Sequence, residues 1–144
     1  KKMLNKSQLN WLSNSLAFLK EKDILFLHGG PDNPQDQYLY SVSKDIFPED
    51  INMLFSGHTH VQIIAKFEKK TYCNPGSVGQ PRDGDSRAAY AILMDGSIAL
   101  HRVNYDIDET VNAMKDFGYD AFYYENLYQG AQIGGRIDKV KIIK

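Results

Sequence analysis

The sequence has one cysteine, no long apolar run and almost no net charge. A lone cysteine, Cys73, cannot form an internal disulfide, which favours a reducing compartment, and we expect a cytoplasmic protein. No apolar stretch approaches the roughly 18 residues that span a bilayer, and no signal-peptide hydrophobic region opens the chain. A formal net charge of -1 gives no basic field for nucleic acid or anionic membranes. We therefore expect a soluble protein with neither of these partners.

The length and composition are those of one globular domain. The chain has 144 residues, of which 42% are hydrophobic and 24% charged, and both values are ordinary for a single domain. The sequence opens with two lysines and has no initiating methionine. We therefore expect it to be a segment of a longer protein.

The apolar pattern predicts a mixture of helices and strands. Leucines at helical spacing predict a first helix over 7–20, with Ser7 as its N-cap. Asp95-Gly96 suits the two-residue turn of a hairpin. The tail from residue 130 is expected to be frayed or to form an edge strand. The other expected elements are strands at 23–27, 51–55, 61–67, 70–73, 88–94 and 97–103, helices at 35–43, 108–114 and 119–128, and a long loop over 74–85.

Three of the four histidines follow apolar runs that resemble strands. His58 and His60 lie two residues apart, so in an extended backbone both side chains point to one face. His28 ends the run over 24–27, and α/β sheets hold their ligands at such strand ends. His101 lies inside an alternating run, and we interpret it as structural. The pattern favours a metal centre, although two solvated or hydrogen-bonded histidines around Thr59 would give the same spacing.

Four stretches carry a resemblance to a known family. In their order and spacing the sequence resembles the calcineurin-like metallophosphoesterase superfamily, and within it the small prokaryotic phosphoesterases of the diadenosine-tetraphosphatase-like type. The specific signature is Gly57-His-Thr-His60 followed by Asn74-Pro-Gly-Ser77. The resemblance extends over roughly 1–132, and its stretches are 26–34, 55–60, 74–85 and 102–110.

The resemblance implies an α/β fold, a four-layer αββα sandwich, with a dinuclear metal centre at one end of its sheets. By the family pattern, His28 and His58 would bind one ion and His60 the other, with Asn74 beside the site and the substrate. Arg82 is a candidate for binding the substrate phosphate, and a solvated loop arginine is the alternative. The two ions would be divalent transition metals, because imidazole suits manganese, iron, nickel and zinc, and manganese or iron is the usual choice. The implied reaction is hydrolysis of phosphomonoesters, phosphodiesters or nucleotide polyphosphates by metal-activated water.

The family motifs Asp-x-His, Gly-Asp-x-x-Asp and Gly-Asn-His are missing from this sequence. They would supply the aspartate that bridges the metals and the histidine that acts as general acid, so we expect no catalytic residue of either kind here. Asp32, Asp83 and Asp85 lie in loops and do not replace them. We expect residues 1–132 to form the C-terminal portion of a phosphoesterase domain and 133–144 a tail or edge strand. Such a half should be inactive without its N-terminal half or a swapped second copy.

Two alternatives stay open. The same fold can serve as a non-catalytic scaffold for protein binding, as in a retromer subunit that resembles it. In the second alternative the histidines hold one structural or adventitious metal. A closed structural zinc site needs four ligands, and Cys73 would then have to be the fourth.

Overall fold

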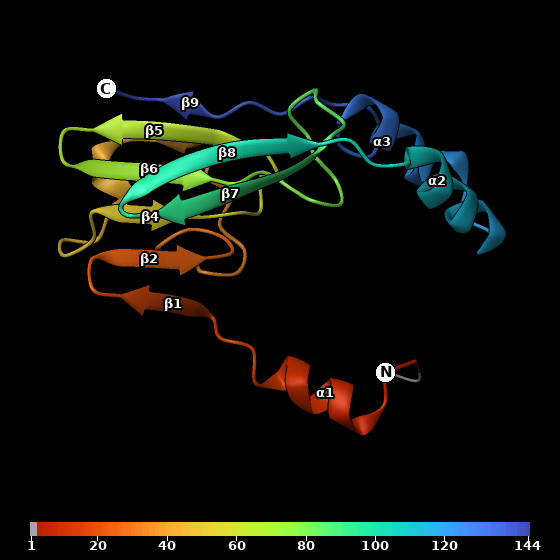
Figure 1. Cartoon of the computed structure of the whole chain (residues 1–144), viewed down its shortest axis with the longest axis horizontal. Helices are drawn as coiled ribbons and strands as arrows, with labels where there is room; N and C mark the ends of the chain where they lie inside the picture. The colour runs from red at the N-terminus through yellow and green to blue at the C-terminus, as the bar shows by residue number, and fades with distance from the viewer. Residues whose placement is uncertain (1–2) are drawn as a thin grey trace.

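A five-stranded sheet forms the centre of the computed structural model, which describes residues 3–144. The strand order is β1-β2-β4-β6-β5 (Figure 1). The three inner strands β2, β4 and β6 are parallel, whereas β1 and β5 run antiparallel to their neighbours at the two edges. The bounds are β1 Phe18–Glu21, β2 Ile24–Leu27, β4 Met53–Phe55, β5 Ile63–Phe67 and β6 Lys70–Asn74.

The register of the inner strands places large apolar side chains in rows across the sheet. Leu54 of β4 is opposite Leu25 of β2 and Tyr72 of β6, and all three side chains are buried. Tyr72 satisfies its hydroxyl through Ser56, at 2.9 Å. Burial of such rows is the main favourable contribution to folding. The other buried members of this core are Leu39, Val42, Phe47, Ile51, Ala65 and Phe67.

The predicted hairpin over 88–103 is confirmed. Strand β7, Ala88–Met94, pairs antiparallel with β8, Ser97–Val103. The two turn residues, Asp95 and Gly96, both have positive φ, 50° and 73°, as a type I′ turn requires. The hairpin lies over β4 and β6 (Figure 1), and the amide of Ala89 donates to the carbonyl of Ser77 at 2.9 Å. The molecule therefore has two β layers.

The first helix is shorter than predicted. Helix α1 covers Lys6–Ser13, and its N-cap is Asn5 instead of Ser7. Asn5 and Gln8 form a capping box with reciprocal hydrogen bonds of 2.9 Å, which sets the start of the helix. No residue of α1 is buried. Most helix stability in proteins comes from tertiary contacts of the apolar face, and α1 lacks such contacts. The helix therefore ends at Ser13, and residues 18–20 of the predicted helix belong to strand β1.

The helix predicted over 35–43 is wrong. Residues 29–37 form turns, in which the amide of Gly29 donates to Pro34 O and the amide of Gln37 to Asn33 O. These bonds close a single turn capped by Asn33, whose Oδ1 accepts from the amides of Gln35 and Asp36 at 3.2 and 3.1 Å, and the chain leaves that turn after Gln37. The segment ends in β3, Ser41–Val42, which is parallel to β9, Lys141–Ile142. The 3₁₀ turn η1, Lys44–Ile46, follows β3.

The C-terminal helices also differ in their bounds. Helix α2 covers Ile107–Asp116 and is capped by Asp106 rather than Asp108. The helix predicted over 119–128 divides into η2, Ala121–Tyr123, and α3, Glu125–Gln129. The break is at Tyr124, whose φ of -131° is not helical. Across residues 3–144, no helix is long and apolar enough to cross a membrane.

Candidate metal centre

The candidate site lies where the three parallel strands end (Figure 1). His28 directly follows β2, His58 and His60 lie in the loop after β4, and Asn74 is the last residue of β6. The carboxyl ends of parallel strands meet at one edge of a sheet, where α/β folds bind their ligands. The sheet therefore brings together side chains that are almost fifty residues apart in sequence.

His28 and His58 meet ring to ring. His28 Nε2 and His58 Nδ1 are 2.8 Å apart, and the ring centroids are 4.6 Å apart with planes at 61°. Burial lowers the pKa of His58, and the neighbouring His28 lowers it further. A lower pKa favours the neutral imidazole, which is the form that binds metal ions. These two nitrogens therefore converge on one position where a cation could replace the shared proton.

An aromatic ring fixes one side of His58. The Tyr38 ring stacks on it with centroids 3.7 Å apart, and Tyr40 stacks in turn on Tyr38 at 5.5 Å. Neither tyrosine was predicted to be near the site. The helix predicted over 35–43 would separate the two rings, because residues two apart in a helix do not face each other.

Asn74 holds the loop of residues 57–60 by hydrogen bonds from the end of β6. Its side chain is fully buried, as is that of Thr59. Asn74 Nδ2 donates to Gly57 O at 2.8 Å and to Thr59 Oγ1 at 2.9 Å, while its Oδ1 accepts from the Gly76 amide at 2.9 Å. These contacts support a backbone in which His58 and His60 both have positive φ, 60° and 58°. Asn74 therefore orients the loop, and its direct contact with substrate stays a prediction.

His60 is held in one tautomer. Its Nδ1 is 2.7 Å from the carbonyl oxygen of Gln80. A carbonyl only accepts, so Nδ1 is the donor and the neutral ring keeps its lone pair on Nε2. Burial lowers the pKa of His60, although the bond to Gln80 partly offsets this. A histidine whose second nitrogen donates to a carbonyl has the usual arrangement of a metal ligand.

Arg82 places a positive charge beside these histidines. Its charge lowers the pKa of both His58 and His60. Nη2 donates to Gln80 Oε1 at 2.9 Å, whereas Nε is buried and has no partner. The buried Nε is closed to solvent, so a substrate oxygen would have to approach the guanidinium at another nitrogen. The binding of substrate by Arg82 stays a prediction.

Three of the aspartates near the site are engaged elsewhere, whereas the charge of Asp36 lies close enough to His58 to offset part of the lowering of its pKa by burial. Asp83 binds Arg102 and the Gln62 amide, and Asp32 accepts from Gln37 Nε2 at 2.8 Å. The hydrogen bond from Arg87 is the main reason that the pKa of Asp85 falls to about 2. Among residues 3–144, no group of three or more histidine, cysteine or acidic side chains is placed to hold an ion. The described chain thus brings two imidazoles together and holds the third apart on Gln80.

Cys73 and His101 both lie away from the paired histidines, and each is packed against its neighbours in a β-strand. Cys73 is fully buried, and burial raises the pKa of its thiol to about 12. The thiolate, not the thiol, binds metal, so Cys73 is not placed to complete a structural zinc site. His101 pairs with Tyr90 across the β7–β8 hairpin, with rings stacked at 5.0 Å. This fits the structural interpretation of His101.

The comparison with family models decides the family. The model described as the calcineurin-like phosphoesterase superfamily domain matches residues 5–95, which is more than half of the chain. The chain belongs to the calcineurin-like phosphoesterase superfamily. Proteins of this superfamily generally use divalent metal ions.

Solved structures agree with this calcineurin-like assignment. A metallophosphoesterase from Sphaerobacter thermophilus superposes with a TM-score of 0.82 at 29% identity, covering 90% of this chain and 65% of that one. A hypothetical protein from Pyrococcus horikoshii superposes with a TM-score of 0.74 at 20% identity, covering 91% and 57%. The predicted α/β metallophosphoesterase fold is confirmed.

A relative found by sequence is also longer than this chain. An uncharacterized protein from Methanocaldococcus jannaschii is 29% identical over an alignment of 152 residues, gaps included, and the alignment covers 90% of this chain and 63% of that protein. The chain therefore spans less than two thirds of the length of each of these relatives.

The burial of Cys73 gives a first prediction. In the native protein at about pH 8, iodoacetamide should leave Cys73 unmodified for hours, because the thiol is buried and protonated. In urea the same thiol should react within minutes, as measured by mass spectrometry. Native labelling as fast as labelling in urea would show that the β6 strand is not buried as described.

Proposed function

We propose that His28, His58 and His60 are the imidazole ligands of a metal-dependent phosphoesterase site. The substrates would be phosphomonoesters, phosphodiesters or nucleotide polyphosphates. The observation that carries the proposal is the approach of His28 Nε2 and His58 Nδ1 to 2.8 Å at the carboxyl edge of the parallel strands. Two imidazole nitrogens at this distance share a proton, and a cation that binds both of them would take the place of that proton.

The donor set favours divalent transition metals. Imidazole nitrogens suit manganese, iron, nickel and zinc, whereas magnesium prefers oxygen. We propose two ions, with manganese as the first choice, where His28 and His58 bind one and His60 presents Nε2 to the other. When bound, such ions lower the pKa of water and stabilise charge on phosphate oxygens.

The surrounding residues would handle the substrate. The Arg82 guanidinium, whose charge acts on both His58 and His60, would bind a phosphate oxygen. Asn74 keeps the loop with His58 and His60 in its left-handed conformation, so it fixes the ligand positions before an ion binds.

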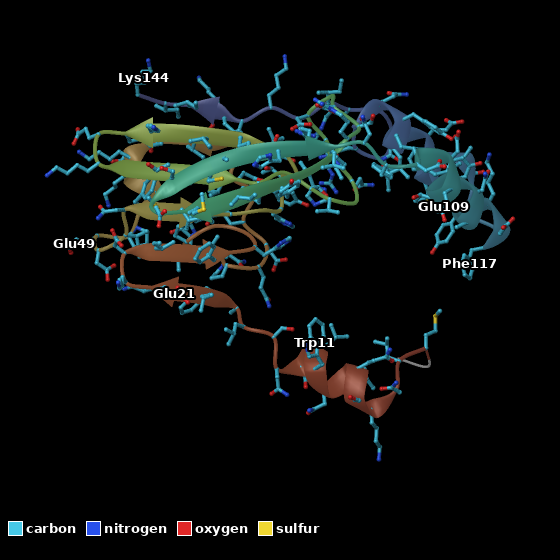
Figure 2. The ribbon with its side chains drawn as sticks, in the orientation of Figure 1. Trp11, Glu21, Glu49, Glu109, Phe117 and Lys144 are labelled. Atoms are coloured by element: carbon cyan, nitrogen blue, oxygen red, sulfur yellow. The ribbon has the colours of Figure 1, made fainter. Side chains whose placement is uncertain are left out.

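The bridging carboxylate and the general acid would come from outside the described residues. We propose that they come from the N-terminal half of the same domain, with a swapped second copy as the other source. Support comes from β1, whose four residues are all exposed, and from α1, where Trp11 is 73% exposed. Figure 2 shows Trp11 on a helix that lies apart from the sheet. On this account the chain alone is inactive.

A non-catalytic scaffold of the same fold is the second candidate. Its support is that no group of three or more histidine, cysteine or acidic side chains within residues 3–144 is placed to hold an ion. The two candidates differ in their dependence on metal: a scaffold that has lost catalysis has no need for converging imidazoles.

Manganese binding tests the ligand assignment. The substitution His58→Ala should weaken binding by roughly 10-fold or more, because one of two converging ligands is lost. His101→Ala is the matched control, since its ring stacks on Tyr90 away from the site, and it should bind like the wild type. The measurement is the free manganese signal in electron paramagnetic resonance during a titration. Equal affinities in both variants would overturn the assignment.

Hydrolysis of an aryl phosphate tests the need for a partner. The 144-residue chain with manganese should release no more phenol than the His58→Ala variant, because the general acid is missing. If the wild type instead shows turnover that His58→Ala abolishes and His101→Ala retains, the site is complete in this chain or in its oligomer.

A further inference from the structure

We infer that Arg102 and Asp83 form a clamp that positions His60 through the loop carrying Gln80. The metal-binding role of His60 that this clamp would serve rests on the proposed function above. Arg102 lies on β8, in the hairpin layer, and is about forty residues from His60 in sequence. Neither residue of the clamp touches the imidazole, so both are positioning residues.

Two segments run side by side at the site. His60 Nδ1 donates to Gln80 O at 2.7 Å, and the Arg82 amide donates to His60 O at 3.2 Å. The next hydrogen bond joins the backbone to a side chain: the backbone amide of Gln62 donates to Asp83 Oδ2 at 2.8 Å. The Asp83 carboxylate thus ties the loop to the residue after Val61, in addition to the bonds from the Gln80 amide to Ser77 Oγ at 3.0 Å and from the Asp138 amide to Arg82 O at 2.7 Å.

Arg102 holds that carboxylate. Its Nη2 donates to Asp83 Oδ2, and its Nε donates to Gln62 Oε1 at 2.8 Å. Its Nη1 donates to the carbonyls of Asp85, at 3.0 Å, and Arg87, at 3.1 Å. The Arg102 and Asp83 side chains are only 11% and 13% exposed. One guanidinium thus joins both segments, a geometry that lysine cannot reproduce.

Gln62 extends the same connection into the second β layer. Its Nε2 lies 3.2 Å from Pro75 O, 3.2 Å from Tyr90 O and 3.0 Å from His101 O. The hairpin layer, the sheet and the loop over 75–87 therefore meet at one side chain. The clamp transmits the position of the hairpin to the loop that fixes the His60 tautomer.

The tautomer of His60 is the direct readout. It can be measured in the metal-free chain by long-range nitrogen–proton correlation spectra, at about pH 8.5 where the rings are neutral. The test variant is Arg102→Gln. The matched control is Arg87→Gln, because Arg87 is also an arginine paired with a nearby aspartate, Asp85, but its side chain is 49% exposed.

In the wild type, His60 should be almost entirely in the Nδ1–H form. In Arg102→Gln, about half or more of the population should change to Nε2–H, since the Gln80 carbonyl is no longer held in place. Asp83→Asn, which keeps the side-chain shape, should shift the population in the same direction, and Arg102→Lys should restore it only partly. Arg87→Gln should leave the spectrum unchanged. Manganese affinity at His60 should fall by about 10-fold with loss of the clamp.

Three results would overturn the clamp. The first is an unchanged His60 tautomer in a folded Arg102→Gln variant, and the second is an equal shift in Arg87→Gln. The third is loss of the native fold in both Arg102→Gln and Asp83→Asn, which would show that the pair holds the whole domain and not this loop. The proposed function fails separately: wild-type His60 would then keep its tautomer but show no broadening on addition of manganese.

Discussion

The site depends on the register of three parallel strands. Leu25, Leu54 and Tyr72 lie opposite one another across β2, β4 and β6, and this buried row fixes how far each strand extends toward the histidines. A slip of one residue would move a strand by about 3.3 Å and turn its side chains to the other face. That shift exceeds the 2.8 Å between the His28 and His58 nitrogens. Core burial therefore sets the geometry of the imidazole pair.

Hydrogen bonds then fix the conformation of the loop after β4, which strand pairing does not determine. Strand ends place the histidines within reach, but the loop after β4 has two non-glycine residues in the left-handed region, which costs free energy. Buried Asn74 and Thr59 stabilise that conformation from the sheet side. The Gln80 carbonyl, held through Asp83 and Arg102, does so from the hairpin side. The Gln80 carbonyl orients the His60 ring through Nδ1 and leaves Nε2 free for an ion. Asn74 acts on the backbone of the loop and on Thr59.

The sequence predicted the elements whose signals are local. The β7–β8 hairpin follows from Asp95-Gly96 between two alternating runs, and the β5–β6 hairpin from apolar runs on either side of Glu68 and Lys69. The helix ends were less accurate, because Asn5 and Asp106 compete with Ser7 and Asp108 as caps. The apolar spacing over 35–43 predicts a helix, but only one turn forms at Asn33, and the buried Val42 belongs to the pairing of β3 with β9.

The site shows the same division. Motif spacing and the family resemblance point to His28, His58, His60 and Asn74, which the strand ends bring to one edge. Arg82 lies in the loop between β6 and β7. Gln80 acts through its backbone carbonyl, which has no side-chain signature. Arg102 acts through a partner nineteen positions away, Asp83, and such a pair is visible only after the two β layers are assembled.

The most direct test of the metal site is an anomalous difference map from crystals of this chain grown with manganese. We expect a peak between His28 Nε2 and His58 Nδ1, with the two rings moved slightly apart to admit the ion. A map in which manganese binds only elsewhere, while these two nitrogens stay hydrogen-bonded to each other, would contradict the account.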